Sequence, residues 1–470
     1  MVTVGGVESS RAAARAWARL RALEQPEPLT KPMRLPAPAD RDVYRTLNLA
    51  MRIGELMLSG GAGAGDVTST MRAVTSSVGM VRCEPDVTYT IISISYLRGA
   101  DSAPISASRK VSRSGFDGTR LLTVLTVVDD LVEGRIDVAG AQERVEQLRQ
   151  LPHPYPRWVA TGAWGGLAAA VALLLGGGAV VMATAFLATI LTDRLNRRLN
   201  RRQVPFFYQY VVGGAVATLA AIALVAAEVE VNSSLVVASG LIALLPGGLL
   251  VGSVQDAIGG FLVTATARAL EVLILTAGLL TGVALALDVG RRFDIVIEVG
   301  ELASPLSRVP VRVAAAAAAA GLFALANYAP RRVVLLSAVV GAFGFALLDG
   351  LSAAGLSRPT ATAGAAIAMG IVCHVLADRA RLAPLLLLVP AIIPQLPGLT
   401  IFQALLAITT GQQAAGLSLL LSALTIGLAL AAGVIFGELV AQPVRREVHR
   451  LERRVGPRLI GPRRRRDTSP

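Results

Sequence analysis

Long apolar runs, separated by short polar or Gly-rich connections, dominate the chain from Trp158 onward. Several of these runs approach the roughly 20 residues that a helix needs to cross a bilayer. The pattern predicts ten membrane spans, near residues 158–175, 178–192, 205–227, 234–255, 257–287, 311–329, 333–356, 360–377, 384–408 and 415–441. The fifth run contains Arg268 and Glu271, which leaves open whether residues 257–271 cross the membrane or lie at its surface.

Two of the predicted spans are interrupted by the same triplet, Leu-Pro-Gly, and Pro397 stands 151 residues after Pro246. Proline removes a backbone donor and glycine tolerates unusual dihedral angles, so each triplet frees backbone groups inside the membrane. A single triplet is also compatible with a proline kink in an ordinary packing helix. In secondary transporters, however, paired interruptions in the two halves point to the substrate site.

Ten spans with the broken span fourth in each set of five predict a duplicated chain. A five-span unit that is repeated in one chain enters the membrane in opposite senses, so the two halves are expected to be inverted. We therefore predict a polytopic α-helical membrane protein with an inverted 5+5 repeat. Its halves are expected at residues 157–288 and 311–442, joined by an extracytoplasmic loop at 289–310.

Arginines gather in alternate connections, as expected for short cytoplasmic loops. They follow the second, sixth and eighth spans, at Arg194, Arg197, Arg198, Arg201, Arg202, Arg331, Arg332, Arg379 and Arg381. The opposite connections hold few basic residues, and only the loop at 288–310 dissents with mixed charge. The distribution predicts a multi-pass protein of the plasma membrane with both termini in the cytoplasm.

The residues before the first span predict a small cytoplasmic α+β domain at 41–156. Helical spacing begins at Arg41, Asp66 is expected to cap a helix over 67–78, and 86–96 is expected to be a strand. Residues 121–128 fit either a strand or a helix that continues to Gly134, and 138–151 is expected to be helical. Residues 1–40 are interpreted as a disordered, basic and Pro-rich extension, although a transit peptide or lipid-binding segment remains open.

Composition agrees with a membrane transporter and gives no support for an enzyme. The mean hydropathy is +0.59, and 53% of residues are hydrophobic while only 16% are charged. Cys83 and Cys373 stand in unrelated surroundings, and the three histidines are scattered. Since no paired-Cys, HExxH, P-loop or Ser-His-Asp pattern occurs, we expect no metal, no cofactor and no catalytic residues.

The Gly-rich run at 61–65 suggests two other sites, and its context disfavours both. It follows a predicted helix and lacks a P-loop lysine, which argues against a nucleotide cradle. The sequence Gly63-Ala-Gly-Asp66 spells the motif of intramembrane aspartyl proteases, but charged neighbours such as Arg72 place it outside a span.

Charged side chains within the predicted spans mark candidate functional residues, because each costs about 2.5–3.5 kcal/mol on insertion scales. Asp256 follows the first break, and Arg268 and Glu271 are spaced to pair on one helix face. The predicted substrate site comprises the two breaks and this arginine: Pro246, Gly247, Gly248, Gln395, Pro397, Gly398 and Arg268. Asp256 and Glu271 are the proton-coupling candidates, followed by Asp193, His374, Asp378 and Glu438.

Four segments, in order, resemble the threonine/serine exporter family of the actinobacterial type. They are Gly54–Gly60, the start of the third span at Phe206–Gly214, Gln255–Arg268, and Leu396–Ile401. The resemblance runs from about Arg41 to about Arg446 and implies ten spans, a cytoplasmic N-terminal domain, and export of L-threonine or L-serine driven by the proton motive force. Some relatives are linked to dicarboxylate export, so succinate-like substrates remain an alternative, as does a non-transporting signalling or scaffold protein.

The formal charge of +13 is concentrated in polar segments, including the tail at 443–470. A basic cluster directly after a span is expected to meet anionic lipid rather than nucleic acid, at about 1 kcal/mol per basic residue. The expected partners are thus a small amino acid, protons and membrane lipid, and homo-oligomerisation is left open.

Overall fold

The structure is a computed structural model that describes residues 38–98, 103–111, 117–148, 153–295, 309–380, 382–409 and 411–455. Contacts divide the chain into two compact units, Met1–Arg45 and Thr46–Pro470. Of the first unit only the start of one helix is described. The predicted N-terminal extension up to residue 37 and the tail after residue 455 lie outside the described residues.

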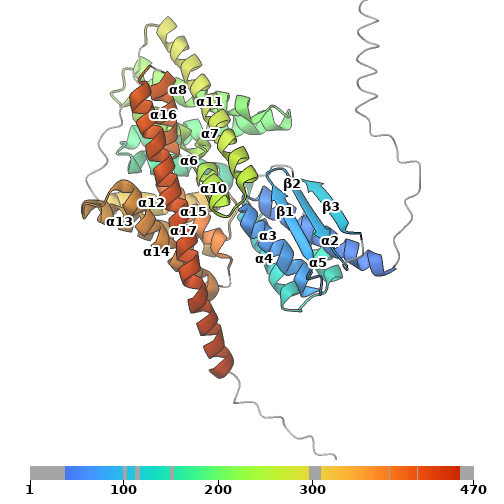
Figure 1. Ribbon diagram of the computed structural model, residues 1–470. Helices are drawn as coiled ribbons and strands as arrows, with labels where there is room; N and C mark the ends of the chain where they lie inside the picture. Colours follow the sequence, from blue (N-terminus) through green and yellow to red (C-terminus); the bar gives the residue numbers. More distant parts are fainter. Residues whose placement is uncertain are drawn as a thin grey trace, which may run out of the picture. The chain divides into compact units, whose positions relative to one another are not determined.

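The described residues before the spans, here called the N-terminal region, combine helices with a small antiparallel sheet (Figure 1). Its elements are α2 (Pro38–Ser59), α3 (Ala64–Ser77), β1 (Cys83–Thr88), β2 (Ile91–Tyr96), β3 (Ile105–Lys110), α4 (Gly118–Val132) and α5 (Val138–Gln147). The strands are ordered β1-β2-β3, with Cys83 opposite Tyr96 and Ile91 opposite Lys110. Burial alternates along β1, so one face of the hairpin packs inward, as the two-residue period of a strand requires.

Three local predictions in this region were wrong. The single strand expected at 86–96 is a hairpin, because the chain turns at Tyr89 and Thr90 without the Gly or Asn that usually marks such a turn. Gly63 occupies the N-cap position of α3, and Asp66 lies in its first turn. The strand β3 was not predicted. The segment that fitted strand or helix is the helix α4, which Asp117 caps by accepting hydrogen bonds from the backbone amides of Thr119 and Arg120.

Eight helices among the described residues are long and apolar enough to cross a membrane, and two bent pairs bring the number to ten if each pair is one span. The helices are α6 (Arg157–Leu174), α7 (Ala179–Arg201), α8 (Phe206–Ala226), α11 (Leu262–Arg292), α12 (Val309–Ala326), α13 (Arg331–Ala353), α14 (Arg358–Ala380) and α17 (Gln413–Val455). The chain is therefore a polytopic helical membrane protein. Because α11 is continuous, Arg268 and Glu271 belong to the same helix as the apolar residues 272–287.

Each bent pair consists of two α-helices joined through a 3₁₀ turn. The first is α9 (Ser233–Leu241), η1 (Ile242–Leu244) and α10 (Gly247–Ile258), bent by 50°. The second is α15 (Pro384–Ile392), η2 (Ile393–Gln395) and α16 (Gly398–Thr409), bent by 42°. Corresponding elements have 9, 3 and 12 residues in both pairs. The two interruptions thus share their local architecture.

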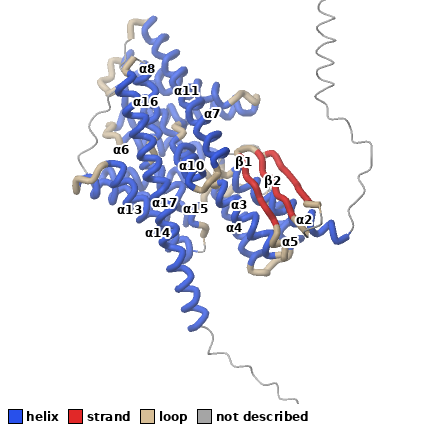
Figure 2. Tube along the Cα trace, in the orientation of Figure 1, coloured by secondary structure: helices blue, strands red, loops and turns tan. Residues whose placement is uncertain are grey.

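Helices make up the membrane part, and the strands lie in the N-terminal region (Figure 2). Neighbouring helices of the two predicted halves also correspond in length. The helices α6 and α12 both have 18 residues, and α7 and α13 both have 23. The packing partners also correspond, since α8 packs against α11 and α14 packs against α17.

Glycine lets these corresponding helix pairs approach closely. A Cβ at Gly282 of α11 would lie 2.0 Å from the carbonyl oxygen of Val211 on α8, and one at Gly433 of α17 would lie 2.7 Å from that of Ala363 on α14. Gly433 follows Gly282 by the same 151 residues that separate the two prolines. Small residues at such contacts are typical of helix packing in membranes.

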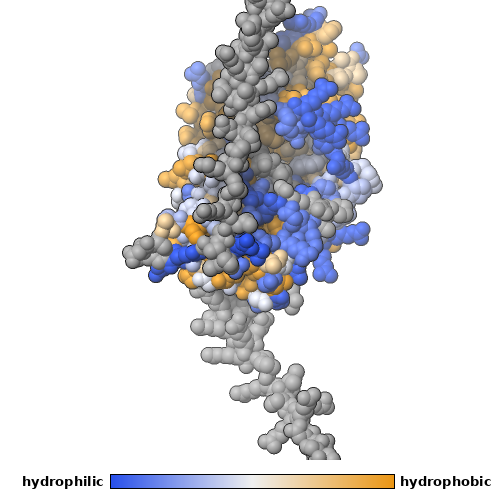
Figure 3. Space-filling view, turned by 90° about the vertical axis from the view of Figure 1, so that its right-hand side faces the viewer, coloured by the Kyte–Doolittle hydropathy of each residue, from blue (hydrophilic) through white to orange (hydrophobic). Residues whose placement is uncertain are grey.

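Large apolar side chains face outward from the span helices, among them Leu187, Leu270, Leu335 and Leu421. In a membrane these side chains contact lipid, so their exposure carries no penalty. Figure 3 views the side that bears the sheet, where hydrophilic surface gathers beside hydrophobic surface of the spans.

The close approach of α8 and α11 predicts the effect of one added methyl group. Gly282→Ala places a Cβ against backbone, which cannot rotate away, and should destabilise the protein by about 1–3 kcal/mol. Gly162→Ala on α6 is the matched control, because no atom lies within 4 Å of its added Cβ. Thermal unfolding of the purified protein should show a lower midpoint for Gly282→Ala alone, and equal midpoints for both variants would contradict the tight packing.

Candidate functional site

The two Leu-Pro-Gly breaks meet each other inside the membrane part. A Cβ at Gly247 would lie 3.0 Å from the backbone nitrogen of Gly398, and one at Gly398 would lie 2.9 Å from the Cβ of Leu245. The residue before each proline is extended, with ψ of 125° at Leu245 and 136° at Leu396. The two interrupted segments therefore cross with their backbones in contact, at the points where the half-helices α10 and α16 begin.

The predicted substrate residues at this crossing differ in exposure. Pro246, Gly247, Pro397 and Gly398 are buried, and Gly248 is exposed. The Gln395 side chain is buried and its Nε2 lies 3.3 Å from the sulfur of Met369, while its Oε1 has no hydrogen-bond partner among the described residues. A buried amide oxygen without a partner is costly, and a ligand donor at this position would satisfy it.

Asp256 and Arg268 form a second polar group, where α10 and α11 pack together. The Arg268 Nη1 lies 3.0 Å from Asp256 Oδ2, and the two side chains are only 7% and 2% exposed. Gly252 leaves room for the guanidinium, since a Cβ there would lie 2.8 Å from Nη1. Arg268 thus pairs with Asp256, whereas the sequence suggested Glu271, which is half-buried on α11.

This ion pair is separate from the crossing of the two breaks. Asp256 lies nine residues after Gly247 on α10, a distance of about 14 Å along a helix axis. The residues that were predicted to form one site therefore lie at two separate places in the membrane part.

The Gly-rich loop between α2 and α3 contacts the ion pair directly. The backbone amide of Ala64 donates a hydrogen bond to Asp256 Oδ1 at 2.9 Å, and Arg268 Nη2 donates one to the carbonyl oxygen of Ala62 at 3.1 Å. Nearby, the Thr264 hydroxyl donates to the carbonyl oxygen of Val87 at 3.2 Å. The N-terminal region therefore provides one hydrogen bond to each member of a buried pair in the membrane part.

Sequence reasoning missed this contact because main-chain atoms make it. The only signal is the concentration of small residues, including Gly61, whose φ of +88° favours glycine, and Gly65, where a Cβ would lie 3.5 Å from Phe261. The loop forms neither of the sites that its glycines suggest, and it docks on the ion pair instead.

A third polar group surrounds Asp66 at the start of α3. The His374 Nε2 lies 3.7 Å from the Glu438 Oε1, and the ring Nδ1 lies 2.8 Å from the carbonyl oxygen of Gly370. Asp66 itself is exposed. Desolvation by the surrounding protein, with the carboxylates of Glu438 and Asp256, nevertheless raises its pKa to about 6. Asp66 therefore lies near several other ionisable groups.

Asp193 and Asp378, the remaining coupling candidates, have other neighbours on their own helices. Asp193 forms an ion pair with Arg197 one turn away on α7. Asp378 lies one turn after His374 on α14. The structure therefore places His374 and Glu438 close enough to Asp66 to interact with its charge. Asp66 was not among the predicted coupling residues.

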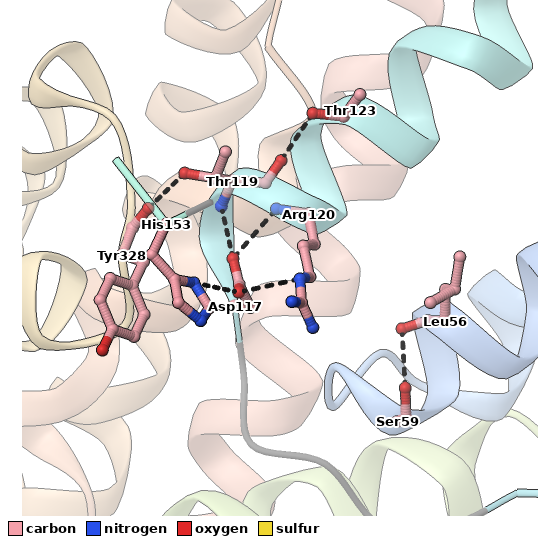
Figure 4. Close-up of polar contacts among 8 residues, drawn as sticks. All are labelled: Leu56, Ser59, Asp117, Thr119, Arg120, Thr123, His153 and Tyr328. Carbon is pink, nitrogen blue, oxygen red and sulfur yellow. Dashed lines mark hydrogen bonds and ion pairs between the residues drawn. The ribbon is translucent and has the colours of Figure 1, made fainter. Parts of the chain in front are cut away.

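The N-terminal region has a second contact with the membrane part, at the connection between α12 and α13 (Figure 4). The Asp117 carboxylate, which caps α4, lies 3.2 Å from His153 Nδ1, and the His153 ring stacks on Tyr328 at 4.1 Å. The Thr119 hydroxyl donates to the carbonyl oxygen of Tyr328, and the Gly118 amide donates to that of Asn327. One contact thus reaches α10 and α11, and the other reaches the second half.

Comparisons with known proteins cover both halves of the chain. A family model described as "Putative threonine/serine exporter" matches residues 48–290, and one described as "Threonine/Serine exporter, ThrE" matches residues 312–440. A "Probable threonine/serine exporter" of Mycobacterium tuberculosis is 36% identical over 416 residues, which cover 86% of this chain and 78% of the relative. A "Threonine/serine exporter" of Corynebacterium glutamicum is 33% identical over 411 residues, covering 86% and 84%. No solved structure matches the chain.

The raised pKa of Asp66 predicts how its removal alters stability with pH. The folded protein holds this proton more tightly than the unfolded chain, whose aspartate titrates near 3.8, so ionising Asp66 lowers stability as the pH rises from about 4 to about 6. The thermal midpoint of Asp66→Asn, relative to wild type, should therefore rise across this window. Asp86→Asn on β1 is the control, because it removes a carboxylate from another exposed aspartate. A difference in thermal midpoint between Asp66→Asn and wild type that does not change with pH would contradict the raised pKa of Asp66.

Proposed function

Because this chain belongs to the threonine/serine exporter family, we propose that it moves L-threonine or L-serine out of the cell across the plasma membrane. One observation carries the proposal: relatives named as threonine/serine exporters align with 86% of the chain, including both the N-terminal region and the spans. The relatives are named as exporters and not as enzymes, in agreement with a transport function.

The transport mechanism that we propose is alternating access by two inverted halves. Two observations support this arrangement. Several corresponding helices have equal lengths, and the two breaks contact each other at Gly247 and Gly398. Half-helix starts expose backbone amides that suit a carboxylate, and the freed carbonyls suit an ammonium group. The proposed substrate path includes the residues predicted at the breaks, namely Pro246, Gly247, Gly248, Gln395, Pro397 and Gly398, and continues to Arg268.

We propose that proton movement drives this export. A proton-coupled carrier needs a group that changes charge during the cycle, and Asp256 and Glu271 are carboxyl groups within the span helices. Asp256 is the better supported of the two, because it contacts both Arg268 and the N-terminal region.

The proposed orientation has both termini, the N-terminal domain at 41–156 and the tail at 443–470 in the cytoplasm. The arginines at the end of α7, at the start of α13 and at the end of α14 support it, because the cytoplasmic ends of spans and their short loops are rich in basic residues. The proposed partners are the amino acid, protons and anionic lipid at the tail.

Flux measurements test the function directly. Cells or inverted vesicles that contain the protein should move labelled threonine in the export direction, and collapsing the proton gradient should abolish net export. Movement of succinate but not threonine would favour the dicarboxylate alternative. The absence of any protein-dependent flux would leave the signalling or scaffold alternative.

Two neutral variants separate the coupling candidates. If Asp256 carries the proton, Asp256→Asn should lose gradient-driven export but retain exchange of threonine at saturating concentration, because the asparagine oxygen still accepts a hydrogen bond. Glu271→Gln should export normally. Counterflow and net export in the same vesicles measure the two activities, with protein insertion checked by quantitative blotting. Normal export by both variants, with proton dependence intact, would place the coupling group elsewhere.

A further inference from the structure

The loop of Ala62, Gly63 and Ala64 meets the ion pair as a zwitterion would. Arg268 donates a hydrogen bond to a carbonyl oxygen of the loop at 3.1 Å, and Asp256 accepts one from a backbone amide of the loop at 2.9 Å. An α-amino acid offers the same two partners, since its carboxylate suits a guanidinium and its ammonium suits a carboxylate. The two loop groups flank Gly63, where an added Cβ would lie 3.6 Å from Asp256 Oδ1, an ordinary contact distance.

The ion pair has unused capacity for a ligand. The Arg268 Nε is buried and has no hydrogen-bond partner among the described residues, and Asp256 Oδ2 has only its ion pair with Arg268. A guanidinium that used a second nitrogen on a carboxylate would bind it bidentately, which is stronger than one bond to a neutral carbonyl. A free amino acid would therefore satisfy this pair better than the loop does.

Resting on the proposed export of threonine or serine, we propose that Asp256 and Arg268 bind the ammonium and carboxylate of the substrate, and that the loop at 61–65 is a tethered mimic that occupies them until substrate displaces it. The N-terminal region is then a gate over the cytoplasmic entrance. Because the loop and the substrate compete, the apparent affinity for threonine is reduced by the fraction of molecules in which the loop is docked.

The chain offers a substitution that removes one of the loop's two bonds. Ala64 is the first residue of α3, a position where proline is favoured because its missing amide makes no bond within the helix. Gly63 already has φ of −65° and ψ of 151°, which is the conformation that a following proline requires. Ala64→Pro therefore deletes the donor to Asp256 and keeps α3.

A matched control exists in the same region. Val138 is the first residue of α5, its preceding residue Asp137 is extended with ψ of 175°, and Asp256 accepts no hydrogen bond from it. Val138→Pro thus makes the same chemical change at another helix start.

Equilibrium binding of labelled L-threonine to the purified full-length protein tests the proposal. Ala64→Pro should bind threonine about tenfold more tightly than wild type, since a hydrogen bond to a charged group contributes at least this factor to the docked state. Val138→Pro should bind as wild type does. Unchanged or weaker binding by a folded Ala64→Pro overturns the proposal.

A second measurement leaves the loop contacts intact. Gly65 is exposed, and a Cβ there would meet Phe261 at 3.5 Å, an ordinary contact, so Gly65→Cys introduces a thiol next to the docked loop. Threonine should raise the rate of maleimide labelling at least threefold. N-acetyl-L-threonine, which lacks the ammonium, and L-threonine methyl ester, which lacks the carboxylate, should not.

The two proposals fail in different ways. An equal response to all three compounds, or none to threonine in a protein that exports it, overturns the tethered mimic and leaves threonine export standing. A protein that neither binds nor exports threonine refutes the export function itself.

Discussion

The buried ion pair between Asp256 and Arg268 constrains how the N-terminal region and the spans fit together. Two charges removed from water destabilise a fold unless further hydrogen bonds satisfy them. Here one of those bonds comes from Ala64 and another goes to Ala62, both outside the spans. The folded membrane part is thus completed by residues almost 200 positions earlier in the chain, and contacts accordingly place both within one unit.

The ion pair also breaks the correspondence between the halves. The positions 151 residues after Asp256 and Arg268 hold Ala407 and Leu419, which are apolar. Backbone geometry, helix lengths and glycine contacts recur in both halves, but this charge pair does not. The helix lengths and breaks thus correspond in the two predicted halves, whereas the charged pair that contacts the loop lies in the first half only.

Much of this could be predicted from the sequence. Span lengths and the repeated Leu-Pro-Gly triplet predicted the membrane helices and their two bends, because hydropathy and proline act locally. The charges within the spans singled out Asp256 and Arg268, but their pairing depends on how α10 turns back onto α11, through Gly260 at φ of +85°. The hairpin at 83–96 and the docking of residues 62–64 were missed, since the first lacks a turn signal and the second is made by main-chain atoms.

The two attachments of the N-terminal region have a mechanical consequence. One is the loop on α10 and α11, and the other is the α4 start with His153 on the connection between α12 and α13. These attachment points lie on different predicted halves, so the N-terminal region connects one half to the other. Any movement of one half relative to the other changes the distance between the two attachment points, and a folded domain stretches very little. If the two halves move as proposed, one of the two attachments has to open in each transport cycle, and the weaker attachment opens first.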